Sequence, residues 1–134
     1  MTRDYAFRVR LDAPYDEALT RVKGSLKAEG FGVLTEVDVK ATFEAKLGVE
    51  FRPYGILGAC NPPLSHRALS RELDAGLVLP CNVVVYEDGD GTEVAIADPE
   101  IIVQTLNKPD LAEIARDARE KLQRVAASLR DEGG

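Results

Sequence analysis

The side chains best suited to chemistry lie in two short segments that share a Cys-Asn dipeptide. Cys60-Asn61 and Cys81-Asn82 contain the only two cysteines of the chain, and its single histidine, His66, lies between them. Two thiols can serve as nucleophiles or as a redox pair, and with an imidazole they form a soft ligand set for a transition metal. The two amides could orient a polar ligand.

The two thiols are expected to differ in reactivity. Asn61 is suited to cap a helix that begins at Pro62, so Cys60 would stand just before a helix N-terminus. The positive end of the helix dipole favours thiolate there. Cys81 follows Pro80 in an apolar segment, where burial keeps a thiol neutral. We therefore predict that Cys60 is the more reactive thiol. The alternative is that both are core residues, because free cysteine is commonly buried.

The pattern gives little support for a metal site, and no cofactor is expected. Three ligands without a spacing such as Cys-x-x-Cys are a weak signal, and His66 is expected on the surface of a short helix. Asn61 and Asn82 could equally be a helix cap and a buried amide at an irregular strand. Tyr54 could stack on a ligand or pack in the core with its hydroxyl at the rim. The candidate ligand-binding residues are Cys60, Asn61, Cys81, Asn82 and Tyr54.

Length and charge narrow the function classes. The 134 residues fit one domain, 1–134, and the net charge of −6 argues against a nucleic-acid binder or an anionic-membrane binder. The sequence contains no apolar run of about 20 residues, the length that spans a bilayer. Because the N-terminus has no signal-peptide core, we expect a cytoplasmic protein whose cysteines are reduced.

Hydrophobic periodicity predicts alternating strands and helices. The predicted strands span residues 5–11, 32–38, 54–60, 76–87 and 92–97. The predicted helices span residues 14–29, 39–47, 62–72, about 99–106, and a long segment from a cap at Asp110 to about Leu129. Pro80 implies an edge strand or a bulge in the fourth strand. This order predicts an α+β domain with an antiparallel sheet of about four to five strands and helices on one face.

The polar face of the predicted sheet has two interpretations. Arg8 and Arg10 on the first strand could pair with Glu36 and Asp38 on the second, as a solvated charge ladder. The two carboxylates could instead bind a cation or take part in acid–base chemistry. Alternatively, this face is a binding or self-association surface. We expect the outer face or an exposed edge to mediate a homodimer, because uncovered sheets are usually protected or paired.

Several segments resemble a known family. These are residues 29–38, 47–54, 56–62 and 79–83, which include Gly-Ala-Cys-Asn-Pro and Leu-Pro-Cys-Asn-Val. With these segments the sequence resembles the domain-of-unknown-function 302 family, and the resemblance covers nearly the whole chain. The resemblance implies a fold like that of the TATA-binding protein, with the element order strand, helix, four strands, helix. This similarity concerns the fold alone. It implies no established activity and no catalytic residues, since a fold does not determine a function.

These observations favour a non-enzymatic domain that binds a small ligand or a partner near the two Cys-Asn dipeptides. The alternative is a thiol-dependent redox or metal-handling protein that uses Cys60 and Cys81. The sequence leaves open whether the protein is an enzyme.

Overall fold

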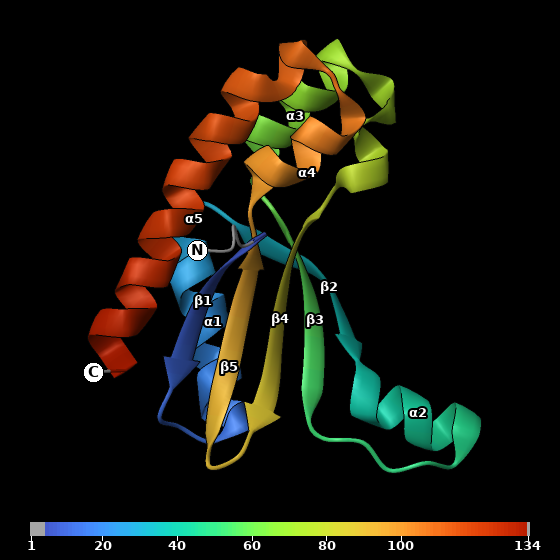
Figure 1. The fold of residues 1–134 in the computed structure, drawn as a ribbon, viewed down its shortest axis with the longest axis vertical. Helices are drawn as coiled ribbons and strands as arrows, with labels where there is room; N and C mark the ends of the chain where they lie inside the picture. The colour runs from blue at the N-terminus through green and yellow to red at the C-terminus, as the bar shows by residue number, and fades with distance from the viewer. Residues whose placement is uncertain (1–4, 134) are drawn as a thin grey trace.

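A five-stranded antiparallel sheet forms the centre of the molecule (Figure 1). In this computed structural model, residues 5–133 are described, with the side chains of residues 5–130; residues 1–4 and 134 of the predicted domain lie outside that range. The strands are β1 Ala6–Leu11, β2 Gly32–Asp38, β3 Tyr54–Cys60, β4 Cys81–Asp88 and β5 Gly91–Ala97, in the spatial order β1-β5-β4-β3-β2. The predicted α+β class and antiparallel sheet are confirmed.

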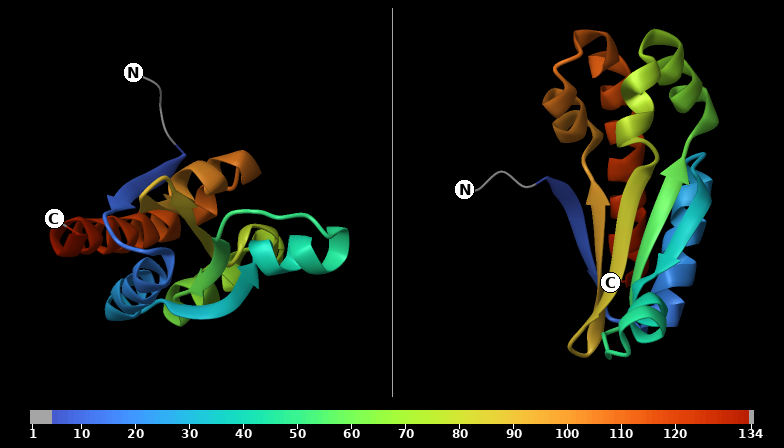
Figure 2. Two further views of the ribbon diagram at one scale, coloured as in Figure 1. Left: turned by 90° about the horizontal axis from the view of Figure 1, so that it is seen from below. Right: turned by 90° about the vertical axis from the view of Figure 1, so that its right-hand side faces the viewer.

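The helices fall into three groups around the sheet. They are α1 Tyr15–Ala28, α2 Val39–Leu47, α3 Pro62–Arg71, α4 Pro99–Leu106 and α5 Ala112–Gly133, with the 3₁₀ helices η1 Leu73–Val78 and η2 Pro109–Leu111. Helices α1 and α5 cover one face, while α3, η1 and α4 gather at one end of the sheet (Figures 1 and 2). Helix α2 projects beyond the opposite end, and none of the described helices lies over the other sheet face. None of the helices described is long and apolar enough to cross a membrane.

The main core lies between the sheet and the two covering helices. Strand side chains alternate between faces, so every second residue points toward α1 and α5. Each aliphatic side chain that is fully buried there contributes about 1.5–3 kcal/mol. The largest members are Leu11, Val22, Leu26, Phe31, Leu57, Val83, Val85, Val94, Ile96, Leu122 and Leu129.

A second, smaller core lies at the helical end of the sheet. Its buried members come from α3, η1, η2 and α5. Partly buried Leu79, Val103 and Leu106 pack against it. This cluster surrounds the end of β3 and the beginning of β4, where the two Cys-Asn dipeptides lie.

The predicted strand over residues 76–87 is wrong in its first half. Residues Leu73–Val78 form η1, and the strand begins at Cys81, after a cis Leu79–Pro80 peptide bond. Pro80 has no N–H to donate to a ladder, so it precedes the strand instead of lying within it. Strand β4 is not at an edge, because β3 and β5 flank it.

The predicted cap of the last helix is also displaced. Asp110 lies within η2, and α5 begins at Ala112. A 3₁₀ turn that begins at Pro109 therefore leads into the helix, as such turns often do at helix ends.

The predicted charge ladder between the first two strands does not form. Strands β1 and β2 lie at opposite edges of the sheet. Arg10 instead bonds the carboxylates of Asp88 at 3.0 Å and Asp90 at 3.2 Å, on the β4–β5 turn. Glu36 accepts a bond from Lys23 of α1 at 2.7 Å.

A register shift between Val33 and Thr35 explains why Glu36 faces the helices. The bulged residue reverses the faces of the side chains that follow it. Asp38 at the end of the strand accepts a bond from the Ala41 N–H at 2.9 Å and so caps α2. Both carboxylates therefore have structural partners.

Candidate functional site

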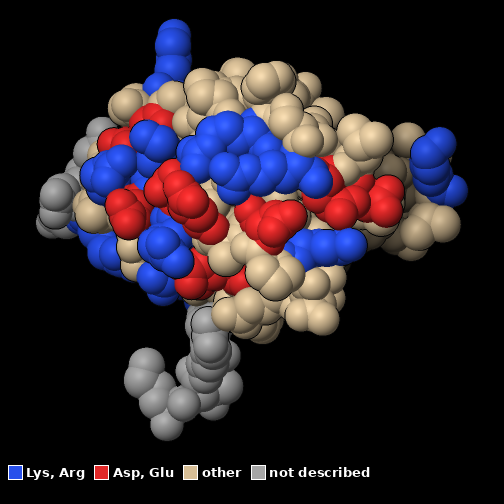
Figure 3. Space-filling view, turned by 90° about the horizontal axis from the view of Figure 1, so that it is seen from above, with Lys and Arg blue, Asp and Glu red and all other residues tan. Residues whose placement is uncertain are grey.

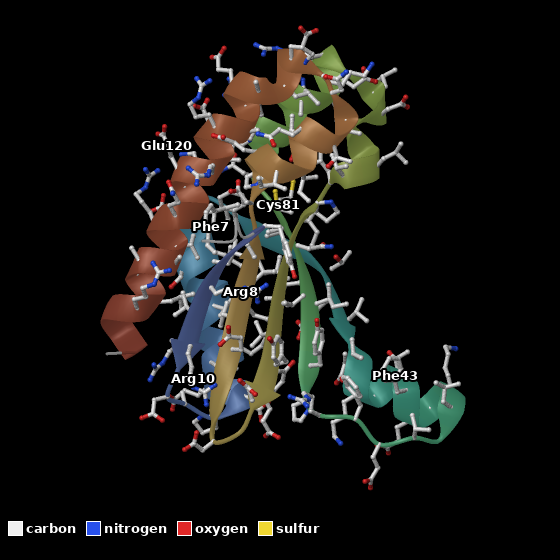
Figure 4. The ribbon with its side chains drawn as sticks, in the orientation of Figure 1. Phe7, Arg8, Arg10, Phe43, Cys81 and Glu120 are labelled. Atoms are coloured by element: carbon white, nitrogen blue, oxygen red, sulfur yellow. The ribbon has the colours of Figure 1, made fainter. Side chains whose placement is uncertain are left out.

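The structure brings the two cysteines together at the helical end of the sheet. In the register of β3 and β4, Ala59 lies opposite Cys81, so Cys60 is one residue further along the neighbouring strand. Cys81 lies at the beginning of β4, beneath α4 (Figure 4). Both thiols are free and partly buried.

Cys60 contacts the first turn of α3. Its Sγ lies 3.1 Å from the Oγ of Ser65, and either atom can donate the hydrogen bond. The contact arises because β3 ends at Cys60 and the helix begins two residues later, at Pro62. The chain turns at Asn61 and carries Ser65 back over the thiol.

Asn61 is the N-cap of α3, as the sequence predicts. Its buried Oδ1 accepts a bond from the Leu64 N–H at 3.3 Å. Its Nδ2 donates to the carbonyl oxygen of Glu29 at 3.4 Å, at the end of α1. Both ends of the amide thus have protein partners, and Asn61 holds the turn between β3 and α3 against α1. This geometry supports the structural interpretation of Asn61.

Cys81 is a poor nucleophile at neutral pH. Burial, and secondarily the neighbouring Cys60, raise the pKa of its thiol to about 11. Burial has this effect because a low-dielectric environment disfavours the charged thiolate. The Cys81 side chain instead lines a cavity, described below.

The remaining sequence-predicted residues do not join this group. Tyr54 lies at the far end of β3, roughly 20 Å from Cys60 at about 3.3 Å per residue. It stacks on Tyr86, with ring centroids 5.2 Å apart. His66 is exposed on α3. Within residues 5–133, no group of three or more His, Cys, Asp and Glu side chains is placed to hold a metal ion.

An apolar cavity of about 60 Å³ adjoins Cys81. It lies between the end of the sheet and the helices of the second core, with walls from α3, η1, α4 and α5. Alanine and larger aliphatic side chains form most of its surface. Ser65, Asn61 and Cys81 supply the polar atoms at its sheet end.

A groove of about 400 Å³ runs along the other side of the same walls. It lies between η1 and α4 and reaches Asn82, which is exposed opposite Gly58 on β3. The groove and the cavity share wall residues Val78, Leu79, Cys81, Pro99 and Val103.

Sequence reasoning missed the contribution of α4 to this site. The signal was present in the apolar run Ile101-Ile102-Val103 directly after Pro99. None of these three side chains is fully buried, although all are large and aliphatic. Such partly exposed residues beside a cavity are typical of a binding groove.

Polar contacts close the helical end above the cavity. Lys108 pairs with Glu72 at 3.3 Å, and the Arg71 guanidinium donates to the carbonyl oxygen of Asp110 at 3.0 Å. The Asp74 N–H, and then Lys108, hold the pKa of Glu72 below its usual value. Acidic and basic side chains interleave over this end of the molecule (Figure 3). These contacts join the α3–η1 segment to the α4–η2 segment.

The comparisons with known proteins agree with this fold. The family model described as "Domain of unknown function DUF302" matches residues 7–129. A solved structure, an uncharacterized conserved protein DUF302 from Bacillus stearothermophilus, is similar with a TM-score of 0.85 and 35% sequence identity. That match covers 98% of this chain and 100% of the other. No curated protein matches the chain. Because the family model spans nearly all of its residues, this chain belongs to the DUF302 family of domains of unknown function.

Proposed function

We propose that this protein is a non-enzymatic binding domain for a small, uncharged ligand with an apolar end and a neutral polar head. The ligand lies in the groove beside α4 and extends an apolar group into the cavity next to Cys81. The observation that supports this proposal best is the shared wall: Leu79, Cys81, Pro99 and Val103 face both spaces. A small shift of these side chains would join the cavity and the groove into one site.

The chemistry of the walls defines the ligand class. Among the residues the structure describes, no Asp, Glu, Lys or Arg side chain lines the cavity or the groove. Burying a charged group without a partner is costly, so the buried part of the ligand carries no charge. Asn82 at the open side of the groove is the amide that would meet a polar head group.

The volumes of the cavity and the groove determine the shape of ligand that we expect. The cavity of about 60 Å³ accepts only a small aliphatic or ring group, while the groove of about 400 Å³ accepts the rest of the molecule. An elongated ligand with an apolar end and a neutral polar head fits both spaces.

A second candidate is a thiol-dependent redox or metal-handling role for Cys60 and Cys81. It is favoured by their position on neighbouring strands, one residue apart in register. The raised pKa of Cys81 opposes it, because a thiolate is the reactive and metal-binding form. We also propose a cytoplasmic location, which is supported by two neighbouring cysteines that remain free.

A cavity-filling variant tests the ligand site. Ala68 of α3 is buried in the cavity wall, and Ala127 of α5 is exposed outside it. We expect the neutral fluorescent probe N-phenyl-1-naphthylamine to bind the native protein saturably. Ala68→Leu should weaken binding at least about tenfold, because the added methylenes occupy the ligand space, whereas Ala127→Leu should not. Equal binding by both variants, or no saturable binding, would contradict the proposal.

A further inference from the structure

No helix within residues 5–133 lies over the sheet face opposite α1 and α5 (Figures 1 and 4). We call this surface the open face. Its residues alternate with the core residues along each strand, and four of the five strands contribute to one apolar row. In the sheet register, Val37 lies beside Ile56, Ile56 beside Val84, Val84 beside Ala95, and Ala95 beside Arg8. The row is therefore apolar over β2, β3, β4 and β5 and ends in a cation on β1.

A parallel row of the open face is aromatic. Tyr54 stacks on Tyr86, and Phe51 lies 6.2 Å from the Tyr54 ring. Phe51 remains 39% exposed. Toward β1 this row continues with Glu93 opposite Arg10. The row is thus aromatic at one side and charged at the other.

Helix α2 and the segment after it extend the apolar surface. None of the nine residues of this helix is buried, and such short helices are marginal in water by themselves. Phe43 touches Phe51, with ring centroids 5.1 Å apart. Leu47 and Val49 are 68% and 46% exposed. An uncovered apolar surface next to a weakly supported helix indicates a protein partner.

We propose that the open face binds the open face of a second copy of this chain, in a homodimer whose two-fold axis lies in the interface near Val84. The composition fits such an interface, with an apolar centre, two tyrosines and two arginines. No lysine occurs at the described open-face positions of the five strands, although the chain has six elsewhere. Lysine is depleted and tyrosine and arginine are enriched at protein interfaces.

Charge and area also favour a second copy. The chain carries a net charge of −6, but on the open face Arg8 and Arg10 are balanced by Glu93 and Asp88, so two copies can approach. Five strands about 4.8 Å apart and about 20 Å long present roughly 500 Å² of flat area. A stable dimer buries roughly 800 Å² on each partner. The flat strand area is smaller than this, so the dimer interface also includes the α2 segment, where Leu47 and Val49 are exposed.

Sedimentation equilibrium from about 1 to about 100 µM tests the proposal. We expect a dimer. Val84→Asp should raise its dissociation constant at least about 100-fold, since Val84 meets its own copy at the axis. Val37→Arg, at the exposed edge strand, should raise it about 30-fold and is the variant to use if Val84→Asp does not fold. Leu73→Asp, on η1 and 85% exposed, is the matched control and should leave the dimer intact.

Cross-linking then locates the interface. In a Cys60→Ser, Cys81→Ser background, Val84→Cys should be joined to its own copy by a short bis-maleimide, whereas Leu73→Cys should not. A monomer at every concentration would overturn the proposal. So would a dimer that survives both Val84→Asp and Val37→Arg, or one that is cross-linked through Leu73→Cys and not through Val84→Cys.

Discussion

The Sγ of Cys60 lies 3.1 Å from the Oγ of Ser65, on the helix that begins directly after the Asn61 cap. Cys81, one residue away in the neighbouring register, faces the apolar cavity instead. The two thiols therefore occupy different environments at the same end of the sheet. This difference leads to opposite expectations for their chemistry.

Alkylation should occur mainly at Cys60. At pH 8 a thiol with a pKa of about 11, such as Cys81, is ionised in roughly one molecule in a thousand. We expect Cys60→Ser to remove most fast modification of the folded protein, and Cys81→Ser to leave it nearly intact. Mass spectrometry after a brief exposure to iodoacetamide measures both. Modification mainly at Cys81 would contradict the protection of that thiol by burial.

Alkaline pH should destabilise the protein through Cys81. The folded state raises the pKa of this thiol from 9.0 to about 11, so the folded state holds the proton more tightly than the unfolded chain. The stabilisation is complete below pH 9 and is lost as the pH rises from 9 toward 11, by up to roughly 2–3 kcal/mol. Urea unfolding at pH 9 and pH 10 measures part of this loss, which Cys81→Ala should reduce.

Tyr15 provides the control for that experiment. Burial, and then Asp38 and Glu36, raise the pKa of its hydroxyl from 10.0 to about 12. Its contribution to the free energy of unfolding is therefore lost only above pH 10. Tyr15→Phe should leave the loss between pH 9 and 10 unchanged. If Cys81→Ala leaves that loss unchanged as well, burial does not control the Cys81 thiol.

Gly58 should tolerate no side chain. A Cβ at this position would overlap the Oγ1 of Thr35 and lie 2.7 Å from the Cγ of Pro80. We expect Gly58→Val to lower the free energy of unfolding by more than about 1 kcal/mol. Gly32→Ala on β2 is the control, because no atom lies within 4 Å of its added Cβ. Equal denaturation midpoints for Gly58→Val and the native protein would show that nothing approaches Gly58 closely.

Ligand charge should decide affinity at the proposed site. The groove and cavity are lined by aliphatic side chains, Cys81 and a few neutral polar groups. We therefore expect dodecanol to displace a bound neutral probe more effectively than dodecanoate, by at least about tenfold, because the carboxylate would lose its hydration without gaining a partner. Competition at pH 8, below the micelle concentration of either compound, gives the comparison. Preference for dodecanoate would point to a basic site elsewhere.

Local patterns predicted most of the secondary structure. The strand over Tyr54–Cys60, the helix over Val39–Leu47 and the Asn61 cap were all predicted from neighbouring residues, because caps, turns and periodicity are local properties. Residues 76–78 are predicted as the beginning of a strand but form the second half of η1. These residues fit a strand or a buried helical turn equally well, and periodicity cannot separate these for short runs.

The spatial relationships were harder to predict. Neighbouring residues in the sequence do not indicate that β1 and β2 lie at opposite edges of the sheet. They also do not indicate that a register shift after Val33 turns the Glu36 side chain toward α1. Tyr54 is a candidate because its ring could stack on a ligand, yet it stands at the opposite end of β3 from Cys60. The cavity beside Cys81 depends on Val103 and other residues distant in the sequence, which only the packed structure brings together.

A nitrogen–proton correlation spectrum recorded while the neutral naphthylamine probe is added tests the central proposal most directly. If the ligand lies in the cavity and groove, the largest shifts should fall on the amides of Cys81, Leu79 and Val103, which line both spaces. Those shifts should vanish in Ala68→Leu. Shifts confined to the open face around Tyr86 and Val84, with Cys81 unmoved, would contradict a ligand site at the helical end of the sheet.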